Sequence, residues 1–176
     1  MERSVIWACS ALLCACGDGQ YDAKTPGDPI GQFAITGALR RDDCEAAVLG
    51  VVDPWEFEVK LSRLGSDLYW LNGREAISGS ISADRSFAFD ARVDIALERS
   101  RAGRPGCTLS RRDRASGTLS PDAVTAATIE GEIAFRYEVR PGFDCSNAIG
   151  VPGGFARLPC EVRFDLAGER LDPPPE

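Results

Sequence analysis

Apolar and polar residues alternate over most of this chain. Between Trp55 and Leu61 every second residue is apolar, and the residues between them are Glu, Glu and Lys. The same alternation runs from Phe87 to Leu97 and from Ile133 to Val139. Because successive side chains of a strand point to opposite faces of a sheet, this period predicts strands with one buried face. The one helical feature we expect is a short turn near Asp43–Val48.

Eight such segments are expected, and the connections between several of them are short and rich in Gly, Asn, Asp and Pro. Short connections favour pairing between strands that follow each other, so the segments predict an antiparallel meander. A meander with one continuous apolar face is stable when it closes into a barrel or folds into a two-layer sandwich, and the pattern leaves both open. The fold class is therefore all-β. The expected strands cover residues 30–40, 55–63, 67–72, 76–82, 86–98, 107–120, 124–140 and 157–167.

This β-domain is expected over residues 30–171, between two segments that have few apolar side chains. Residues 17–29 contain Gly, Pro and Asp and predict a flexible tether. After Leu171 the chain ends in Asp172-Pro173-Pro174-Pro175-Glu176, which predicts a disordered tail over residues 172–176. About 140 residues are enough for one well-buried core, so we expect a single domain.

The first residues predict export. Met1-Glu2-Arg3 precedes a nine-residue apolar run from Val5 to Leu13, which is too short for a membrane-spanning helix of about 20 residues. It fits the hydrophobic region of a secretory signal peptide. The segment Leu13-Cys14-Ala15-Cys16 that ends it resembles the lipobox of bacterial lipoproteins.

The lipobox resemblance implies a signal peptide over residues 1–15 and a lipidated N-terminus at Cys16, followed by the tether over residues 16–29. Cys14 is a second candidate, with the bulky Leu13 before it, and an ordinary secretory signal is the alternative. The resemblance further implies attachment to a membrane through the N-terminal lipid and a place in the cell envelope. Gly17 after the Cys, in place of a retention Asp, implies the outer membrane. The β-domain is similar to those of uncharacterised envelope lipoproteins, and no functional residues carry over.

Four of the seven cysteines lie in the domain: Cys44, Cys107, Cys145 and Cys160. An even number in an exported domain predicts two disulfides. None belongs to a close pair such as C-x₂-C, so a metal site is not expected. An up-and-down strand order places all four at one end, with the long connections. Cys145 and Cys160 bracket a loop rich in Gly and Pro, which favours the pairs Cys145–Cys160 and Cys44–Cys107, although three pairings are compatible with the sequence.

Charge and composition exclude several classes of function. The formal net charge is −7, which argues against nucleic acid as a partner. The chain has no histidine, the commonest general base and zinc ligand. The positions expected to face inward carry large apolar side chains and no carboxylate, amide or lysine. We therefore expect no catalytic residues, no enzyme activity, no cofactor and no metal.

An arginine cluster is the most conspicuous polar feature. Six arginines stand between residues 99 and 114 against one acid, Asp113. Guanidinium groups pair with phosphate and carboxylate, so the cluster is a candidate contact patch for an envelope glycolipid or polysaccharide. The alternative is a solvated hairpin balanced by glutamates on neighbouring strands. The six residues are Arg99, Arg101, Arg104, Arg111, Arg112 and Arg114.

These observations predict a membrane-anchored envelope lipoprotein that acts as a non-catalytic binding or scaffolding module for an envelope protein or polysaccharide. The alternative is a lipocalin-like carrier of a small apolar ligand, because an eight-stranded barrel is just wide enough to hold one. That likeness is architectural, because Gly31-Gln32-Phe33 has Phe where lipocalins carry Trp. The bulk of the inward side chains favours a packed interior. A cavity of several hundred Å³ would instead favour the carrier.

Overall fold

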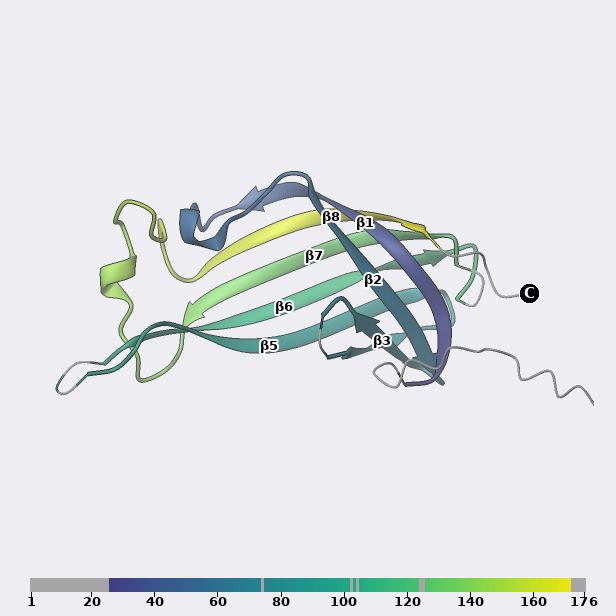
Figure 1. Ribbon diagram of the computed structural model, residues 1–176, viewed down its shortest axis with the longest axis horizontal. Coiled ribbons are helices and arrows are strands. Elements are labelled where there is room, and N and C mark those ends of the chain that lie inside the picture. The colour runs from purple at the N-terminus through teal and green to yellow at the C-terminus, as the bar shows by residue number, and fades with distance from the viewer. Residues whose placement is uncertain (1–25, 74, 102, 104, 124–125, 172–176) are drawn as a thin grey trace, which may run out of the picture.

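The alternating segments form the strands of one closed barrel. The computed structural model describes residues 26–73, 75–101, 103, 105–123 and 126–171. Each strand pairs antiparallel with its neighbours in sequence, and β8 returns to β1 (Figure 1). The predicted eight-stranded meander is thus confirmed, and it is a barrel. The elements are β1 (Asp28–Asp42), η1 (Ala47–Leu49), β2 (Trp55–Leu64), β3 (Asp67–Leu71), β4 (Ile77–Ile81), β5 (Ser86–Glu98), β6 (Cys107–Ser120), β7 (Thr128–Val139), η2 (Ser146–Ala148) and β8 (Cys160–Arg170), where η marks a single 3₁₀ turn.

Pairing between β1 and β8 closes the barrel. Ile35 lies opposite Gly168 and Gly37 lies opposite Leu166 in this register. The Ile35 side chain fills the space beside Gly168, where a Cβ atom would overlap its Cδ1. A glycine at residue 168 therefore allows the bulky side chain of the neighbouring strand to pack inside.

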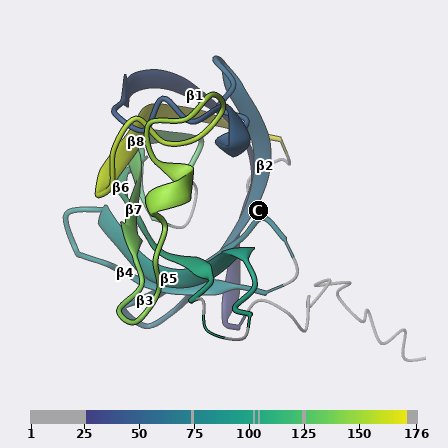
Figure 2. The same cartoon turned by 90° about the vertical axis from the view of Figure 1, so that its left-hand side faces the viewer.

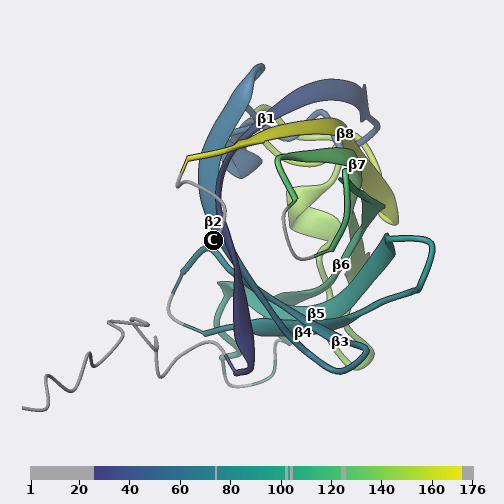
Figure 3. The same ribbon diagram turned by 90° about the vertical axis from the view of Figure 1, so that its right-hand side faces the viewer.

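One end of the barrel, which we call the closed end, is filled by side chains. The first residue of β1 and the last of β8 lie there, at the right of Figure 1, and Figure 3 looks onto it. The turn between β6 and β7 at this end is longer than predicted. β7 begins at Thr128 and not at residue 124, because Ala126 turns into the core and Pro121 has no N–H for the ladder. The fully buried apolar side chains include Phe33, Ile35, Val59, Leu68, Leu119 and Ile129.

The opposite end, which we call the mouth, carries the long connections over residues 43–54 and 141–159. Figure 2 looks onto this end, where the η2 turn lies over the ring of strands. The expected helical turn is the 3₁₀ turn η1, Ala47–Leu49. β8 begins at Cys160, three residues later than predicted, because Pro159 lacks the N–H that would extend its ladder.

All four domain cysteines lie at the mouth and form two disulfides, as predicted, but the favoured pairing is wrong. The bonds join Cys44 to Cys160 and Cys107 to Cys145. Closure makes β8 the neighbour of β1, so the residue that follows β1 by two positions meets the first residue of β8. The first residue of β6 likewise lies next to the segment that follows β7.

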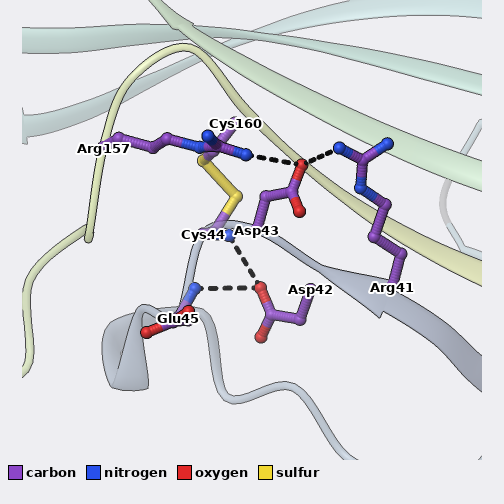
Figure 4. Close-up of a disulfide and its surroundings, with 7 residues drawn as sticks. All are labelled: Arg41, Asp42, Asp43, Cys44, Glu45, Arg157 and Cys160. Atoms are coloured by element: carbon purple, nitrogen blue, oxygen red, sulfur yellow. Dashed lines mark hydrogen bonds and ion pairs between the residues drawn. A yellow bond between two sulfur atoms is a disulfide. The ribbon is translucent and has the colours of Figure 1, made fainter.

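Charged groups surround the Cys44–Cys160 bond (Figure 4). The Asp43 carboxylate pairs with Arg41 at 2.5 Å and with Arg157 at 3.0 Å, so it links the loop after β1 to the loop before β8. Asp42 Oδ1 accepts hydrogen bonds from the N–H groups of Cys44 and Glu45 at 2.9 and 3.0 Å. These bonds form a turn in which Glu45 has a positive φ of 47°. The turn thus directs Cys44 toward β8.

Several predicted segments lie outside the described residues: the signal peptide, Cys16 with most of the tether, and the C-terminal tail. In the part of the chain that the structure describes, no helix has the length and apolar character needed to cross a membrane.

Candidate ligand-binding site in the barrel

The half of the barrel nearer the mouth contains two adjoining cavities. The loop cavity, of about 230 Å³, is lined by Leu49, Gly50, Val51, Val52, Trp55, Arg111, Phe135, Tyr137, Val162 and Phe164. The side cavity, of about 250 Å³, is lined by Trp55, Trp70, Asn72, Ile77, Phe89, Ala91, Arg111, Asp113, Ala115, Ile133 and Phe135. Trp55, Arg111 and Phe135 line both. Each cavity alone is somewhat smaller than the ~300–1,000 Å³ of typical ligand pockets.

Aromatic side chains form most of the walls. The rings of Trp55 and Phe57 stack with centroids 4.2 Å apart, and Trp55 also meets Phe164 at 5.4 Å. Across the side cavity Trp70 meets Phe89 edge to face at 5.5 Å. These rings come from β2, β3, β5 and β8, whose inward positions converge because the sheet closes. The expectation of a packed interior thus holds at the closed end and fails toward the mouth.

Beside the side cavity, between β2 and β5, the strands of the barrel wall are short and end before they reach the mouth. β3 and β4 have five residues each, whereas β2 has ten and β5 has thirteen. β3 pairs with β2 only from Lys60 onward, and β4 pairs with β5 only at residues 87–89. Nearer the mouth than these pairs, β2 is paired with β1 and β5 is paired with β6. The side cavity therefore lies where the wall is lowest.

A charged pair projects into this aromatic space from β6. Arg111 Nε and Nη2 donate to Asp113 Oδ1 and Oδ2, both at 2.7 Å. Arg111 also lies over the ring of Phe135, with Cζ 5.2 Å from its centroid. The two side chains are largely buried, with 28% and 15% of their surface exposed. The prediction that the interior contains no carboxylate is wrong at Asp113.

The sequence contains a signal for this orientation that the composition of the cluster obscures. Cys107, Leu109, Ala115 and Leu119 are the buried residues at the odd-numbered positions of β6. Period two between Leu109 and Ala115 places Arg111 and Asp113 on the same inward face. The run Arg111-Arg112-Asp113-Arg114 has no apolar residue, so its alternation is invisible to a hydrophobicity pattern.

Burial and charge act together on the ionisable groups of the site. Burial by itself lowers the pKa of Arg111, but the hydrogen bonds and charge of Asp113 outweigh it and raise this pKa above its usual value. Burial raises the pKa of the Tyr137 phenol, against the opposing charge of Arg111. At neutral pH the guanidinium is therefore charged and the phenol is neutral.

The structure does not gather the six arginines into one patch. Arg112 and Arg114 lie on the outer face of β6, where both pair with Asp90 of β5. Arg111 faces the opposite way, into the barrel. Arg99 and Arg101 are exposed beyond the end of β5 at the mouth, and Arg104 lies outside the described residues. Within the described residues, no group of three or more His, Cys, Asp or Glu residues is placed to hold a metal ion.

Comparisons with family models, with curated proteins and with solved structures find no match to this chain.

Proposed function

We propose that this chain is an envelope lipoprotein whose barrel binds a small, mostly apolar molecule. The observation that carries the proposal is the pair of aromatic-lined cavities in the half of the barrel nearer the mouth. This favours the carrier over the scaffolding module. Removal of apolar ligand surface from water contributes about 25 cal/mol per Å², and rigid aromatic rings supply such contact at low entropic cost.

The proposed lipid and the mouth belong to opposite ends of the barrel. β1 starts at the closed end, where Pro26 accepts a hydrogen bond from the Ser62 hydroxyl at 2.7 Å. A tether that starts at a membrane-held Cys16 and meets β1 at Asp28 thus joins the barrel at its closed end. This arrangement supports a carrier that is held at a membrane, the outer membrane by the lipobox resemblance, and that exchanges its ligand away from the anchor.

Apolar side chains also surround the mouth. Val52, Val93, Leu97 and Val151 are each between 39% and 54% exposed. Val93 and Leu97 continue the inward face of β5 beyond Ala91, so an apolar surface leads from solvent to the side cavity. We take this surface as the path by which an apolar ligand reaches the cavities.

The test is binding of the neutral apolar dye N-phenyl-1-naphthylamine. The segment 17–176, exported to an oxidising compartment, contains all eight strands and both disulfides. Its two tryptophans, Trp55 and Trp70, both line the side cavity, so energy transfer from them reports a dye bound there. We expect saturable binding at one site, and native mass spectrometry is expected to show loss of a co-purified ligand on denaturation.

A matched pair of variants locates the dye. Ala91→Phe places a ring in the side cavity, whereas Ala88→Phe adds the same ring on the exposed outer face of β5. We expect Ala91→Phe to weaken dye binding at least about tenfold, because the ring occupies the site, and Ala88→Phe to change it less than about twofold. If the native chain binds no dye and releases no ligand, or if both variants bind equally well, the proposal is refuted.

A further inference from the structure

The charges that line the two cavities cancel. Among the described residues, the only charged side chains that line either cavity are Arg111 and Asp113. They are two residues apart on β6 and joined by two hydrogen bonds of 2.7 Å. Both oxygens of the carboxylate accept from the guanidinium. The site therefore presents a strong dipole and no net charge.

We infer that the cavities select neutral ligands that carry a hydrogen-bond acceptor, and that Arg111 and Asp113 determine this selectivity as a pair. The inference rests on the proposed function and names the class of ligand that the site accepts. A ligand of this class has an apolar body against Trp55 and Phe135 and one carbonyl, amide or ether oxygen toward Arg111.

Desolvation disfavours a charged ligand. A charge moved from water into an aromatic-lined cavity requires an opposite charge that is not already satisfied. An anion would meet Arg111 only beside Asp113, which already neutralises it. A cation would likewise meet Asp113 only beside Arg111. A neutral ligand has no charge to desolvate and leaves the ion pair intact.

The hydrogen-bonding capacity of Arg111 explains the preference for an acceptor. A guanidinium has five N–H donors in a planar fork. The two bonds to Asp113 use one hydrogen of Nε and one of Nη2, and the group lines both cavities. Its remaining donors suit a neutral oxygen. The neighbouring Tyr137 phenol, which interacts with Arg111, adds a second polar contact at the loop cavity.

Two dyes that differ by one charged group test the inference. N-phenyl-1-naphthylamine is neutral, and 8-anilino-1-naphthalenesulfonate is the same ring system with a sulfonate. Titration of segment 17–176 with each, at fixed ionic strength, measures the preference for charge. We expect the neutral dye to bind at least about tenfold more tightly, because the sulfonate enters without an available counter-charge.

Two substitutions change the charge of the site in opposite directions. Asp113→Asn leaves Arg111 uncompensated, so we expect the ratio of sulfonate affinity to neutral-dye affinity to rise at least about tenfold. Arg111→Gln leaves Asp113 uncompensated and is expected to weaken sulfonate binding further. Asp90→Asn is the matched control, because Asp90 of β5 pairs with Arg112 of β6 on the outside of the barrel.

The outcomes separate the inference from the proposed function. If the native chain binds neither dye, the proposed function fails and the inference with it. If it binds both dyes and the sulfonate equally well or better, the inference fails while a binding barrel remains. An equal gain in sulfonate affinity from Asp113→Asn and Asp90→Asn also overturns it, because the effect is then one of overall charge. If Asp113→Asn does not fold, the preference of the native chain between the two dyes and the effect of Arg111→Gln still test the inference.

Discussion

Cys107, the first residue of β6, is bonded to Cys145 in the segment that follows β7. Backbone hydrogen bonds flank this bond on both sides: the Arg140 N–H donates to Thr108 O at 2.9 Å, and the Asp144 N–H donates to Gly106 O at 3.1 Å. The segment thus runs beside β6 up to the disulfide. The other bond, Cys44–Cys160, similarly ties β1 to β8, so each disulfide fixes one of the two long connections at the mouth.

The two disulfides are expected to differ in their contribution to stability. Cys44 and Cys160 are 116 residues apart, and Cys107 and Cys145 are 38 apart. Restriction of the unfolded chain grows with loop length and gives about 5 and about 4 kcal/mol respectively. Replacing Cys44 and Cys160 by Ala should therefore lower the free energy of unfolding by about 1 kcal/mol more than replacing the other pair. Urea denaturation of the two double variants measures the difference.

Peptide mapping without reduction provides the control for that comparison. It should yield peptides joined through Cys44–Cys160 and Cys107–Cys145 in the unmodified chain. A Cys145–Cys160 linkage would contradict the structure. An equal loss of stability in both double variants would instead show that native-state contacts outweigh chain entropy.

Apolar truncation should cost much more at the closed end than beside the cavities. Phe33 is fully buried, so Phe33→Ala is expected to lower the free energy of unfolding by about 3–5 kcal/mol. Phe57 is only partly buried and lies beside Trp55, where space already exists, so Phe57→Ala should cost less than half as much. Urea midpoints of both variants test this, and equal losses would mean that the two halves are packed alike.

Stability should fall in acid because paired carboxyl groups must take up protons. Hydrogen bonds from Arg41 lower the pKa of Asp43, and hydrogen bonds from Arg112 lower that of Asp90. Their stabilisation is present above the unfolded-state pKa of about 4 and is lost as pH falls through the lower folded-state values. Thermal melting between pH 2 and pH 6 should show this loss, and Asp43→Asn should reduce its slope. An unchanged slope in Asp43→Asn would show that Asp43 does not contribute to the loss of stability in acid.

Stability should not change with pH in the neutral range, and a second loss of stability is expected at high pH. The chain has no histidine to titrate between pH 5 and pH 8. Burial raises the pKa of Tyr137 despite the nearby charge of Arg111. The corresponding stability is fully present below the unfolded-state pKa of about 10 and is lost as pH rises through the folded-state pKa. Melting temperatures that are constant from pH 5 to 8 and fall above about pH 10 would agree, and Tyr137→Phe should weaken the basic loss.

The lipobox resemblance makes a separate prediction about the N-terminus. Cys16→Ser should release the full chain from the membrane fraction and remove the mass of the acyl chains, because the lipobox resemblance places the lipid on Cys16. Cys14→Ser is the matched control and should remain lipidated. Fractionation and intact mass of both variants in a bacterial host measure the outcome. Lipidation that survives Cys16→Ser and is lost in Cys14→Ser would move the modification to Cys14.

The hydrophobic period predicted the strands better than it predicted the site. Trp55, Phe57 and Val59 alternate clearly with charged residues, and β2 was expected almost where it lies. Arg111 and Asp113 follow the same inward parity on β6, but composition grouped them with Arg112 and Arg114 as a surface cluster. A rule based on alternation alone would have placed them inside.

Local patterns were enough to predict the strands and their order. A period of two indicates strands with one buried face, and short connections indicate a meander that places the cysteines at one end. The tertiary structure decided the rest. Closure of β8 onto β1 depends on the summed twist and stagger of all eight strands, and it brought Cys44 beside Cys160. The short β3 and β4 decided that inward side chains fill the closed end and leave cavities toward the mouth. Such volumes depend on how side chains from distant strands meet, which no local pattern encodes.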